Sequence, residues 1–323
     1  MDRIYIEEAL KKSGKVVVKG WVHNTRELGK IRFLLLRDIT GIIQVTAVKG
    51  KVSEAIFKAM NQNKESVLAI EGKIEKNAKA PGGSEIVPDK VELISASEPE
   101  LPIDVSDFSK TELSKRLDYR FLDFHRSKIQ SIFKIQNEIA NSFREFFYKK
   151  GFIEMQPPCV ISSSSEGGTE LFSVKYFEKN AYLAQSPQLY KQMLACSMEK
   201  TFMITPVWRA EKHNTVRHIN EIRQMDIEVA FAGQKQVMKE LEEVIKYIVE
   251  QILKKCKNEL ELLKVKLKVP KAVYLSYEEA IKKVKGKSGE DFTPEQEKKL
   301  CEMYPDSIVF TYSWPSKLKP FYI

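Results

Sequence analysis

The sequence predicts an α+β protein of two domains, an N-terminal β-barrel and a C-terminal region of long helices and strands. The chain has 323 residues, and at about 150 residues per domain two domains are expected. Residues 1–98 alternate apolar and polar side chains with the period of strands, whereas a helical period begins at Ser127. Hydrophobic residues make up 43% of the chain and charged residues 30%, which supplies a packed core and excludes disorder as a class.

Five strands and one helix are expected in residues 1–98. The strands fall at 16–22, 31–37, 41–48, 66–71 and 86–94. Apolar residues at helical spacing predict a short helix over 52–60. Three strands, a helix and two strands is the order of a five-stranded OB-type barrel, which commonly holds single-stranded nucleic acid. An all-β sandwich fits less well, because it has no place for the helix.

The remainder is predicted to open with a hinge, because residues 99–126 contain prolines, several acids and no sustained apolar period. A long helix follows from Ser127 to the stop signal at Gly151, and a second covers 236–255. Strand-like stretches lie between them at 181–184, 202–209 and 224–230. Helices and strands do not alternate strictly, so a doubly wound parallel sheet is not favoured. The predicted division is 1–98, the hinge 99–126, and 127–323.

Charge and cysteine usage restrict the class of protein further. The chain has 53 Lys and Arg against 44 Asp and Glu, a net charge of +9. That balance fits a nucleic-acid partner, and it fits equally a basic protein from a Lys-rich proteome. The cysteines have no metal-ligand spacing and predict reduced thiols in a cytoplasmic protein: Cys159, Cys196, Cys256 and Cys301. The sequence begins without a signal peptide and has no apolar run of membrane-spanning length.

The segment with the most chemical content is 206–218, where Arg209 and Arg217 flank a polar loop between strand-like stretches. An arginine at a strand end clamps a phosphate well, because its guanidinium is planar and permanently charged. Taken alone, the segment is more readily a surface hairpin with solvated charges.

The neighbouring motifs change that weighting. Trp208-Arg209-Ala210-Glu211, followed by a loop and Arg217-His218, is similar to motif 2 of class II aminoacyl-tRNA synthetases. Segment 151–158 looks like motif 1, the dimer-forming element of that class, and segments 165–172 and 185–192 lie between the two. With the barrel, the chain resembles aspartyl-tRNA synthetases of the archaeal and eukaryotic type over essentially all 323 residues.

The resemblance implies a catalytic domain with an antiparallel sheet flanked by helices, and a cytoplasmic homodimeric ligase of protein biosynthesis. It would join aspartate to tRNA(Asp), with ATP as substrate and Mg²⁺ as its counter-ion. Arg209 would be the catalytic residue, bridging the α-phosphate and the aspartate carboxylate. The implied ATP-binding set is Arg209, Ala210, Glu211, Arg217, His218 and Ile219.

The implied aspartate pocket consists of Glu166, Gln188, Leu189, Tyr190, Lys191, Arg209 and Asp226. Glu166 and Gln188 would orient the substrate ammonium, while Asp226 is as readily an ordinary hairpin acid. Lys191 would choose aspartate over asparagine, because a fixed ammonium at about 4 Å attracts a carboxylate by roughly 4 kcal/mol at a dielectric near 20. That energy corresponds to about a thousandfold preference. The alternative for Lys191 is a solvated helix lysine.

On the barrel, Arg26, Phe33 and Gln44 offer a guanidinium, a ring and an amide, the side chains that bind unpaired bases. The resemblance implies that those bases belong to the anticodon. The alternative for Phe33 is that it packs in the barrel core. In similar archaeal enzymes the positions of His23 and Pro81 govern the last anticodon base. A histidine and a proline there favour a non-discriminating enzyme that also charges tRNA(Asn) with aspartate, which requires an amidotransferase downstream.

The match departs from the family in two places. Ile222 stands where many relatives carry an aromatic ring near the adenine. The chain also ends at Ile323 within an expected strand, and it lacks a Gly-rich motif 3 and the metal-binding glutamate of the family. No metal ligand is therefore expected in this chain, and little activation activity is expected from it alone. Two alternatives stay open: a catalytically incomplete tRNA-binding fragment or paralogue, and an asparaginyl-type relative.

Overall fold

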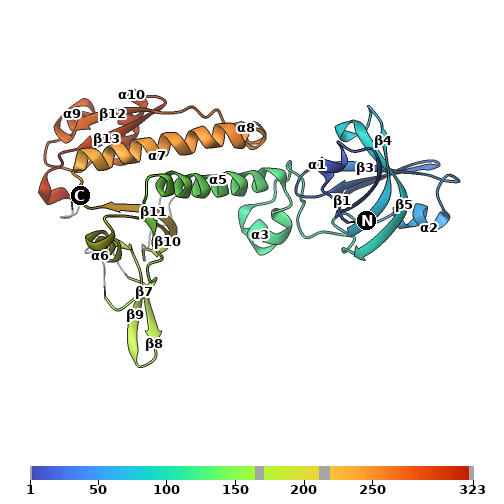
Figure 1. Ribbon diagram of the computed structural model, residues 1–323, viewed down its shortest axis with the longest axis horizontal. Coiled ribbons are helices and arrows are strands. Elements are labelled where there is room, and N and C mark those ends of the chain that lie inside the picture. The colour runs from blue at the N-terminus through green and yellow to red at the C-terminus, as the bar shows by residue number, and fades with distance from the viewer. Residues whose placement is uncertain (1, 164–170, 211–218, 320–323) are drawn as a thin grey trace. The chain divides into compact units, whose positions relative to one another are not determined.

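The computed structural model describes residues 2–163, 171–210 and 219–319. The chain divides into two compact units, Met1–Asp104 and Val105–Ile323 (Figure 1). Among the described residues, no helix combines the length and the apolar character that crossing a membrane requires.

The first unit is a closed five-stranded barrel, which confirms the predicted OB-type fold. Its strands follow one another around the barrel in the order β1-β2-β3-β5-β4. β3 and β5 pair in parallel, and the other described pairs are antiparallel. The elements are α1 (Ile6–Ala9), β1 (Gly14–Leu28), β2 (Ile31–Arg37), β3 (Ile42–Val48), α2 (Glu54–Ala59), β4 (Val67–Lys76), the 3₁₀ turn Pro81–Gly83 and β5 (Ser84–Ser95).

Alternation decides which side chains fill the barrel. Leu34 and Leu36 on β2, with Ile43 and Val45 on β3, have no exposed surface, so their neighbours along each strand face outward. The helix α1 was not predicted, because four residues are too few to show a helical period. Its Ile6 is fully buried in the same core.

The second unit contains two long helices, α5 (Ser127–Lys149) and α7 (Gln234–Lys255), as predicted. They share a core with the strand β10 (Lys200–Trp208), and Phe143, Phe147, Phe202 and Val244 are buried in this core. The predicted inward faces are only partly right, since Ile132 is 49% exposed and Leu241 is 46% exposed. Both helices thus keep apolar surface outside this core.

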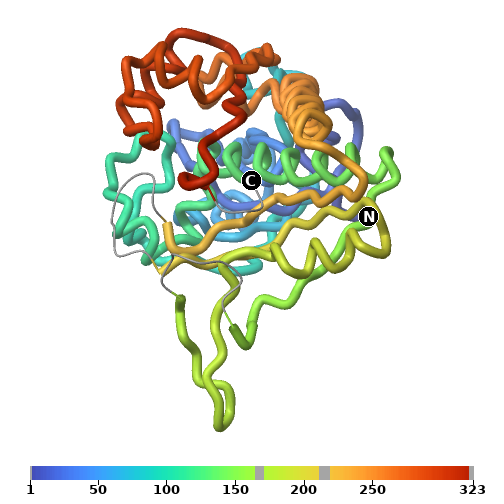
Figure 2. The backbone as a smooth tube through the Cα atoms, turned by 90° about the vertical axis from the view of Figure 1, so that its left-hand side faces the viewer, coloured from blue at the N-terminus to red at the C-terminus, as the bar shows by residue number. Residues whose placement is uncertain are grey.

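The sheet beside these helices has β11 and β10 antiparallel, with β6 parallel to β10; the two long strands run side by side in Figure 2. A second sheet has the order β7-β9-β8, and its β8–β9 hairpin projects from the unit in both views (Figure 1 and Figure 2). The bounds are β6 (Ile153–Glu154), β7 (Val160–Ile161), β8 (Ser173–Tyr176), β9 (Lys179–Leu183), α6 (Gln188–Met198), β10 (Lys200–Trp208) and β11 (Glu221–Val229).

A third group of elements follows α7 and was not predicted. Parallel strands β12 and β13 bury Leu275, Tyr277, Ile281 and Leu300 with their helices. Tyr274 donates to Glu242 of α7 at 2.5 Å, and this hydrogen bond raises the pKa of Tyr274 to about 12. The bounds are α8 (Lys257–Leu263), β12 (Lys271–Ser276), α9 (Tyr277–Lys283), α10 (Pro294–Met303), β13 (Ser307–Tyr312) and the 3₁₀ turn Ser316–Leu318.

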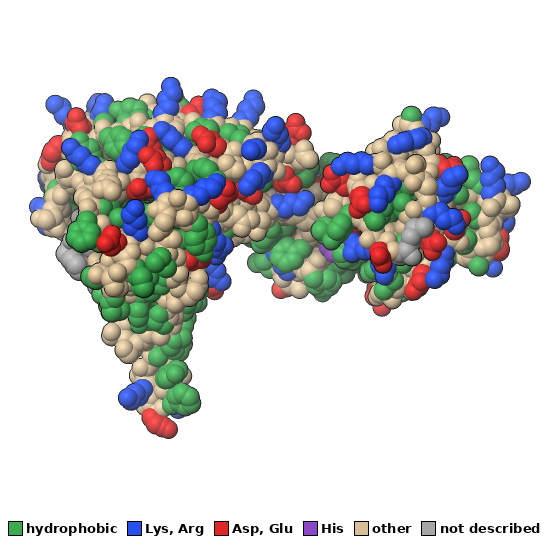
Figure 3. Space-filling view, viewed as in Figure 1, with side chains coloured by type: hydrophobic (Ala, Val, Ile, Leu, Met, Phe, Trp, Pro, Cys, Tyr) green, Lys and Arg blue, Asp and Glu red, His purple; other side chains and the backbone are tan. Residues whose placement is uncertain are grey.

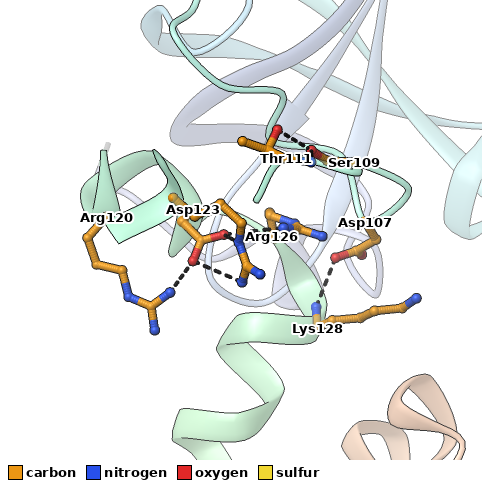
Figure 4. Close-up of polar contacts among 8 residues, drawn as sticks. Asp107, Ser109, Thr111, Arg120, Asp123, Arg126 and Lys128 are labelled. Atoms are coloured by element: carbon orange, nitrogen blue, oxygen red, sulfur yellow. Dashed lines mark hydrogen bonds and ion pairs between the residues drawn. The ribbon is translucent and has the colours of Figure 1, made fainter. Parts of the chain in front are cut away.

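The segment predicted as an irregular hinge contains two short helices, α3 (Leu113–Asp118) and α4 (Arg120–Asp123). Asp123 has no exposed side-chain surface and pairs with Arg116, Arg120 and Arg126. Figure 4 shows Arg120 and Arg126 reaching Asp123 from either side. Burial alone would raise the pKa of Asp123, but the hydrogen bond and charge of Arg116, with the other two arginines, hold it below the usual 3.8.

Candidate active site and nucleic-acid interface

A cavity of about 480 Å³ opens in the second unit between α6, the end of β10, β11 and the start of α7. Its polar lining gathers residues from separate parts of the sequence: Ser186, Gln188, Lys191, Arg209, Gln224 and Glu228. Gln188 begins α6 and is 7% exposed, and its backbone N–H donates to Ser186 Oγ at 3.1 Å. Three of the predicted site residues, Gln188, Lys191 and Arg209, therefore line one cavity.

Lys191 is held between two carboxylates. Its Nζ lies 3.4 Å from Asp226 Oδ2 and 3.5 Å from Glu228 Oε2, and its side chain is 12% exposed. Asp226 and Glu228 are alternate residues of β11 and therefore share one face of the sheet. Lys191 is thus a buried, paired ammonium, not a solvated lysine on a helix surface.

Two buried polar atoms in this cavity have no hydrogen-bond partner. Of the three such side-chain atoms in the described part of the chain, two belong to Arg209 (Nε) and Gln224 (Oε1), and both residues line the cavity. The amide nitrogen of Gln224 is paired, since Nε2 donates to Asp226 Oδ1 at 3.1 Å. Buried polar groups are nearly always paired, so these two atoms are suited to receive a polar ligand.

The register of β10 and β11 fixes where Arg209 lies. β10 pairs with β11 from Lys200↔Val229 to Trp208↔Glu221, and the Arg209 backbone N–H then donates to the Asn220 carbonyl at 3.0 Å. Arg209 therefore begins the loop beyond the strand pair. The cavity has the cations Arg209 and Lys191 on its wall, with two carboxylates beside Lys191, and this arrangement suits a ligand that carries both signs of charge.

The other predicted residues of this site lie in several places. Leu189 is 48% exposed and Ile219 is 62% exposed, while Tyr190 and Ala210 are half-buried. Ile222 faces Val207 across the β10–β11 pair. Four predicted residues lie outside the described residues: Glu166, Glu211, Arg217 and His218.

Glu228 was missed at this site. Its alternation with Asp226 on a predicted strand was a usable signal, whereas the partnership of Gln224 with Asp226 depends on side-chain geometry that no spacing reveals.

On the barrel, a cavity of about 500 Å³ lies over the outer face of β1, β2 and β3. It brings Arg26, Phe33, Gln44 and Pro81 together, with Asn24, Asn77 and Lys79. Phe33 therefore lines an outer cavity and is not core packing. His23 precedes Asn24 on β1, and its Nδ1 lies 3.4 Å from Arg37 Nη1.

Glu85 is a further residue of the barrel face that was not predicted. The Gln44 amide donates to Glu85 Oε2 at 2.7 Å, and Thr46 Oγ1 donates to the same oxygen at 2.5 Å. The parallel pairing Gln44↔Glu85 joins strands that are far apart in the sequence, so no local pattern could place them together.

No group of three or more His, Cys, Asp or Glu side chains that could hold a metal ion occurs within residues 2–163, 171–210 and 219–319.

The comparisons with known proteins identify the family of both units. Residues 16–94 match the OB-fold nucleic acid binding domain, and residues 112–323 match the tRNA synthetases class II (D, K and N). The aspartate–tRNA(Asp/Asn) ligase of Methanopyrus kandleri is 44% identical over 318 residues, 95% of this chain and 74% of that protein. The aspartate–tRNA(Asp) ligase of Pyrococcus abyssi is 44% identical over 323 residues, 96% of this chain and 74% of that protein.

A solved structure has the same fold. The asparaginyl-tRNA synthetase of Pyrococcus horikoshii, complexed with asparaginyl-adenylate, superposes with a TM-score of 0.89 at 33% identity, covering 99% of this chain and 76% of that one. The match over residues 112–323 shows that the chain is a class II aminoacyl-tRNA synthetase of the D, K and N group. Within that class, the chain belongs to the aspartate–tRNA ligase family.

Proposed function

We propose that the protein activates aspartate and transfers it to tRNA. The aspartate α-carboxylate attacks the α-phosphorus of ATP, the bond to the β-phosphate oxygen breaks, and pyrophosphate leaves. The ribose hydroxyl at the tRNA 3′ end then attacks the acyl carbon of aspartyl-adenylate, loses its proton and releases AMP. Because ATP, aspartate and tRNA meet in the cytoplasm, we place the enzyme there.

The observation that carries the proposal is the buried Lys191 in the same cavity as Arg209. An ammonium has three N–H donors, so Lys191 can keep Asp226 and Glu228 and still donate to the side-chain carboxylate of aspartate. An asparagine amide in that position would gain no charge attraction. This supports aspartate, and not asparagine, as the amino-acid substrate.

Arg209 would act on the phosphate. Its guanidinium can donate both to the α-phosphate and to the attacking carboxylate, which reduces the repulsion between two anions as they approach. No side chain needs to act as a covalent nucleophile, so catalysis consists of positioning and charge stabilisation. ATP would arrive with its own Mg²⁺, which would offset part of the triphosphate charge.

The barrel would bind the anticodon in the outer cavity. Phe33 offers a ring for base stacking, Gln44 an amide whose orientation Glu85 holds, and Arg26 a guanidinium for phosphate. With His23 and Pro81 at this face, we propose that both tRNA(Asp) and tRNA(Asn) receive aspartate and that an amidotransferase corrects the second product. The Methanopyrus kandleri relative, named an aspartate–tRNA(Asp/Asn) ligase, supports this.

We also propose that two copies associate through the apolar surface around α3 and the start of α5. Exposed apolar side chains gather there, as Figure 3 shows over α3, and monomers rarely leave such patches uncovered. They are Leu113, Leu117, Phe121, Phe124, Ile132 and Phe133. Sedimentation should give a dimer that Phe121→Asp dissociates, and a monomeric wild type would refute this part.

The activity is tested by binding and by charging. Non-hydrolysable sulfamoyl analogues of the aspartyl, asparaginyl and lysyl adenylates are titrated against the chain, and the aspartyl analogue should bind most tightly. Tightest binding of the asparaginyl analogue would favour the asparaginyl alternative instead. Purified tRNA(Asp) and tRNA(Asn) are then offered with ATP and labelled aspartate. Labelling of tRNA(Asp) alone would overturn the proposed dual specificity, and labelling of neither tRNA would overturn the proposed activity of this chain.

A further inference from the structure

A buried ion pair stands beside the outer cavity of the barrel. Arg37 Nη2 donates to both carboxylate oxygens of Glu65, at 3.0 and 2.8 Å, and the two side chains are 7% and 3% exposed. The backbone of Arg37 is tightly placed as well, because a Cβ on Gly20 would lie 2.2 Å from the Arg37 carbonyl oxygen. The guanidinium is therefore positioned by the barrel and not by solvent.

The row of side chains along β2 links this pair to the cavity. Leu34 and Leu36 point into the barrel core, so Phe33, Leu35 and Arg37 share the opposite face. Phe33 and Leu35 line the outer cavity, and Arg37 is the next residue in that row.

The second nitrogen of the guanidinium contacts His23. Arg37 Nη1 lies 3.4 Å from His23 Nδ1, and a guanidinium has donors but no acceptor, so Nδ1 must accept. An imidazole that accepts at Nδ1 carries its proton on Nε2. The β1 register shifts between Val22 and Asn24; Val22 is buried in the core and Asn24 lines the cavity, so His23 directly precedes a cavity residue along the chain.

We infer that Arg37 and Glu65 are positioning residues that fix the Nε2–H tautomer of His23, so that His23 presents a donor to the base it meets. The inference rests on the proposed anticodon-binding function. Codons for aspartate and asparagine differ in their first letter, so the two tRNAs differ in the third anticodon base, cytosine against uracil. The N3 and C4 positions of these bases exchange donor and acceptor, while both bases carry the O2 acceptor. A donor fixed at Nε2 matches the shared O2 and accepts both tRNAs.

The tautomer is measured first, without tRNA. The chain has four histidines, and ¹⁵N-labelled histidine NMR of the full chain, assigned with His23→Gln, should show His23 with Nδ1 unprotonated and Nε2 protonated. Arg37→Met should give a mixture of tautomers, and Arg37→Lys, which keeps a donor-only cation, should restore the bias. Arg3→Met, which removes an exposed arginine of the same unit, should leave the spectrum of His23 unchanged.

Binding of anticodon stem-loops tests the consequence. Stem-loops that differ only in a cytosine or uracil at the third anticodon base should bind the wild type within about threefold of each other. Arg37→Met should weaken the binding of both stem-loops by about tenfold, the effect of one hydrogen bond. Arg37→Lys should lose less affinity than Arg37→Met, and Arg3→Met should leave the ratio of the two affinities unchanged.

A wild-type His23 in the Nδ1–H tautomer would overturn the inference, as would an Arg37→Met chain that is folded and unchanged in both tautomer and binding. If Arg37→Met does not fold, the Arg37→Lys chain and the wild-type spectrum decide. If neither stem-loop binds the wild type, the proposed function fails, while the NMR result still decides the tautomer.

Discussion

Asp123 is a carboxylate that forms ion pairs with three arginines. It has no exposed side-chain surface, and Arg116 Nε lies 2.7 Å from its Oδ1. Asp123→Asn leaves three guanidinium groups without this counter-charge, of which that of Arg126 is buried, so we expect a loss of about 3 kcal/mol in the free energy of unfolding of the second unit. Urea denaturation followed by circular dichroism measures it. Glu7→Gln, which breaks an exposed pair with Lys11, should cost less than about 1 kcal/mol.

The same residue predicts a dependence on pH. The pKa of Asp123 is lower in the folded chain than its usual 3.8, so its charged form stabilises the fold above that value. This stabilisation is lost as the pH falls below about 4 and through the folded-state pKa. The wild type should therefore lose stability between pH 5 and pH 2 more steeply than Asp123→Asn. Parallel pH profiles for the two proteins would show that Asp123 is not the titrating group.

At the scale of elements, the α5–α7 pair depends on an aromatic core. Phe147 has no exposed surface, and its ring centroid lies 4.8 Å from Phe143 and 5.8 Å from Phe202. Phe147→Ala should cost about 3 to 5 kcal/mol because it leaves a cavity at the junction of helix and sheet. Calorimetry of the second unit's transition measures it. Val265→Ala, at a site 49% exposed, is the control, and an equal loss in both variants would contradict this assignment of the core.

The elements that could be predicted are those whose side chains alternate or repeat against a single core. The strands of the barrel and the helices α5 and α7 were found because burial imposes a period of 2 or about 3.6 on their sequences. The helices α3 and α4 were missed because they are only six and four residues long and are held by ion pairs to Asp123. The helix α1 is too short to show a period.

The site residues also divide into those that the sequence could predict and those that it could not. Lys191, Gln188 and Arg209 were identified from motifs and line one cavity. Glu85 and the Arg37–Glu65 pair were not identified, because each depends on which strands or loops meet in the barrel. Local sequence specifies a strand, whereas its neighbour in a closed barrel is set by topology.

At the scale of the whole molecule, the net charge of +9 makes RNA binding sensitive to salt. Each phosphate neutralised releases counter-ions, so the affinity for tRNA should fall by about ten- to a thousandfold between 50 and 200 mM KCl. Filter binding of tRNA measures this. Binding of the aspartyl-adenylate analogue should change far less, because the side chain of its proposed partner Lys191 is 12% exposed and Nε of Arg209 is buried. A tRNA affinity independent of salt would contradict the electrostatic part of the account.

The central claim is that Lys191 distinguishes an acid from its amide, and the most direct measurement is the ratio of Kd values for the asparaginyl and aspartyl sulfamoyl-adenylates. The wild type should favour the aspartyl analogue by roughly a hundredfold, less than an isolated ammonium would give, because Asp226 and Glu228 offset part of the attraction of Lys191. Lys191→Met should reduce the ratio to below about tenfold, while Lys239→Met, which removes an α7 lysine that is 60% exposed, should leave it unchanged. A Lys191→Met protein that binds both analogues and keeps the full preference would contradict the claim.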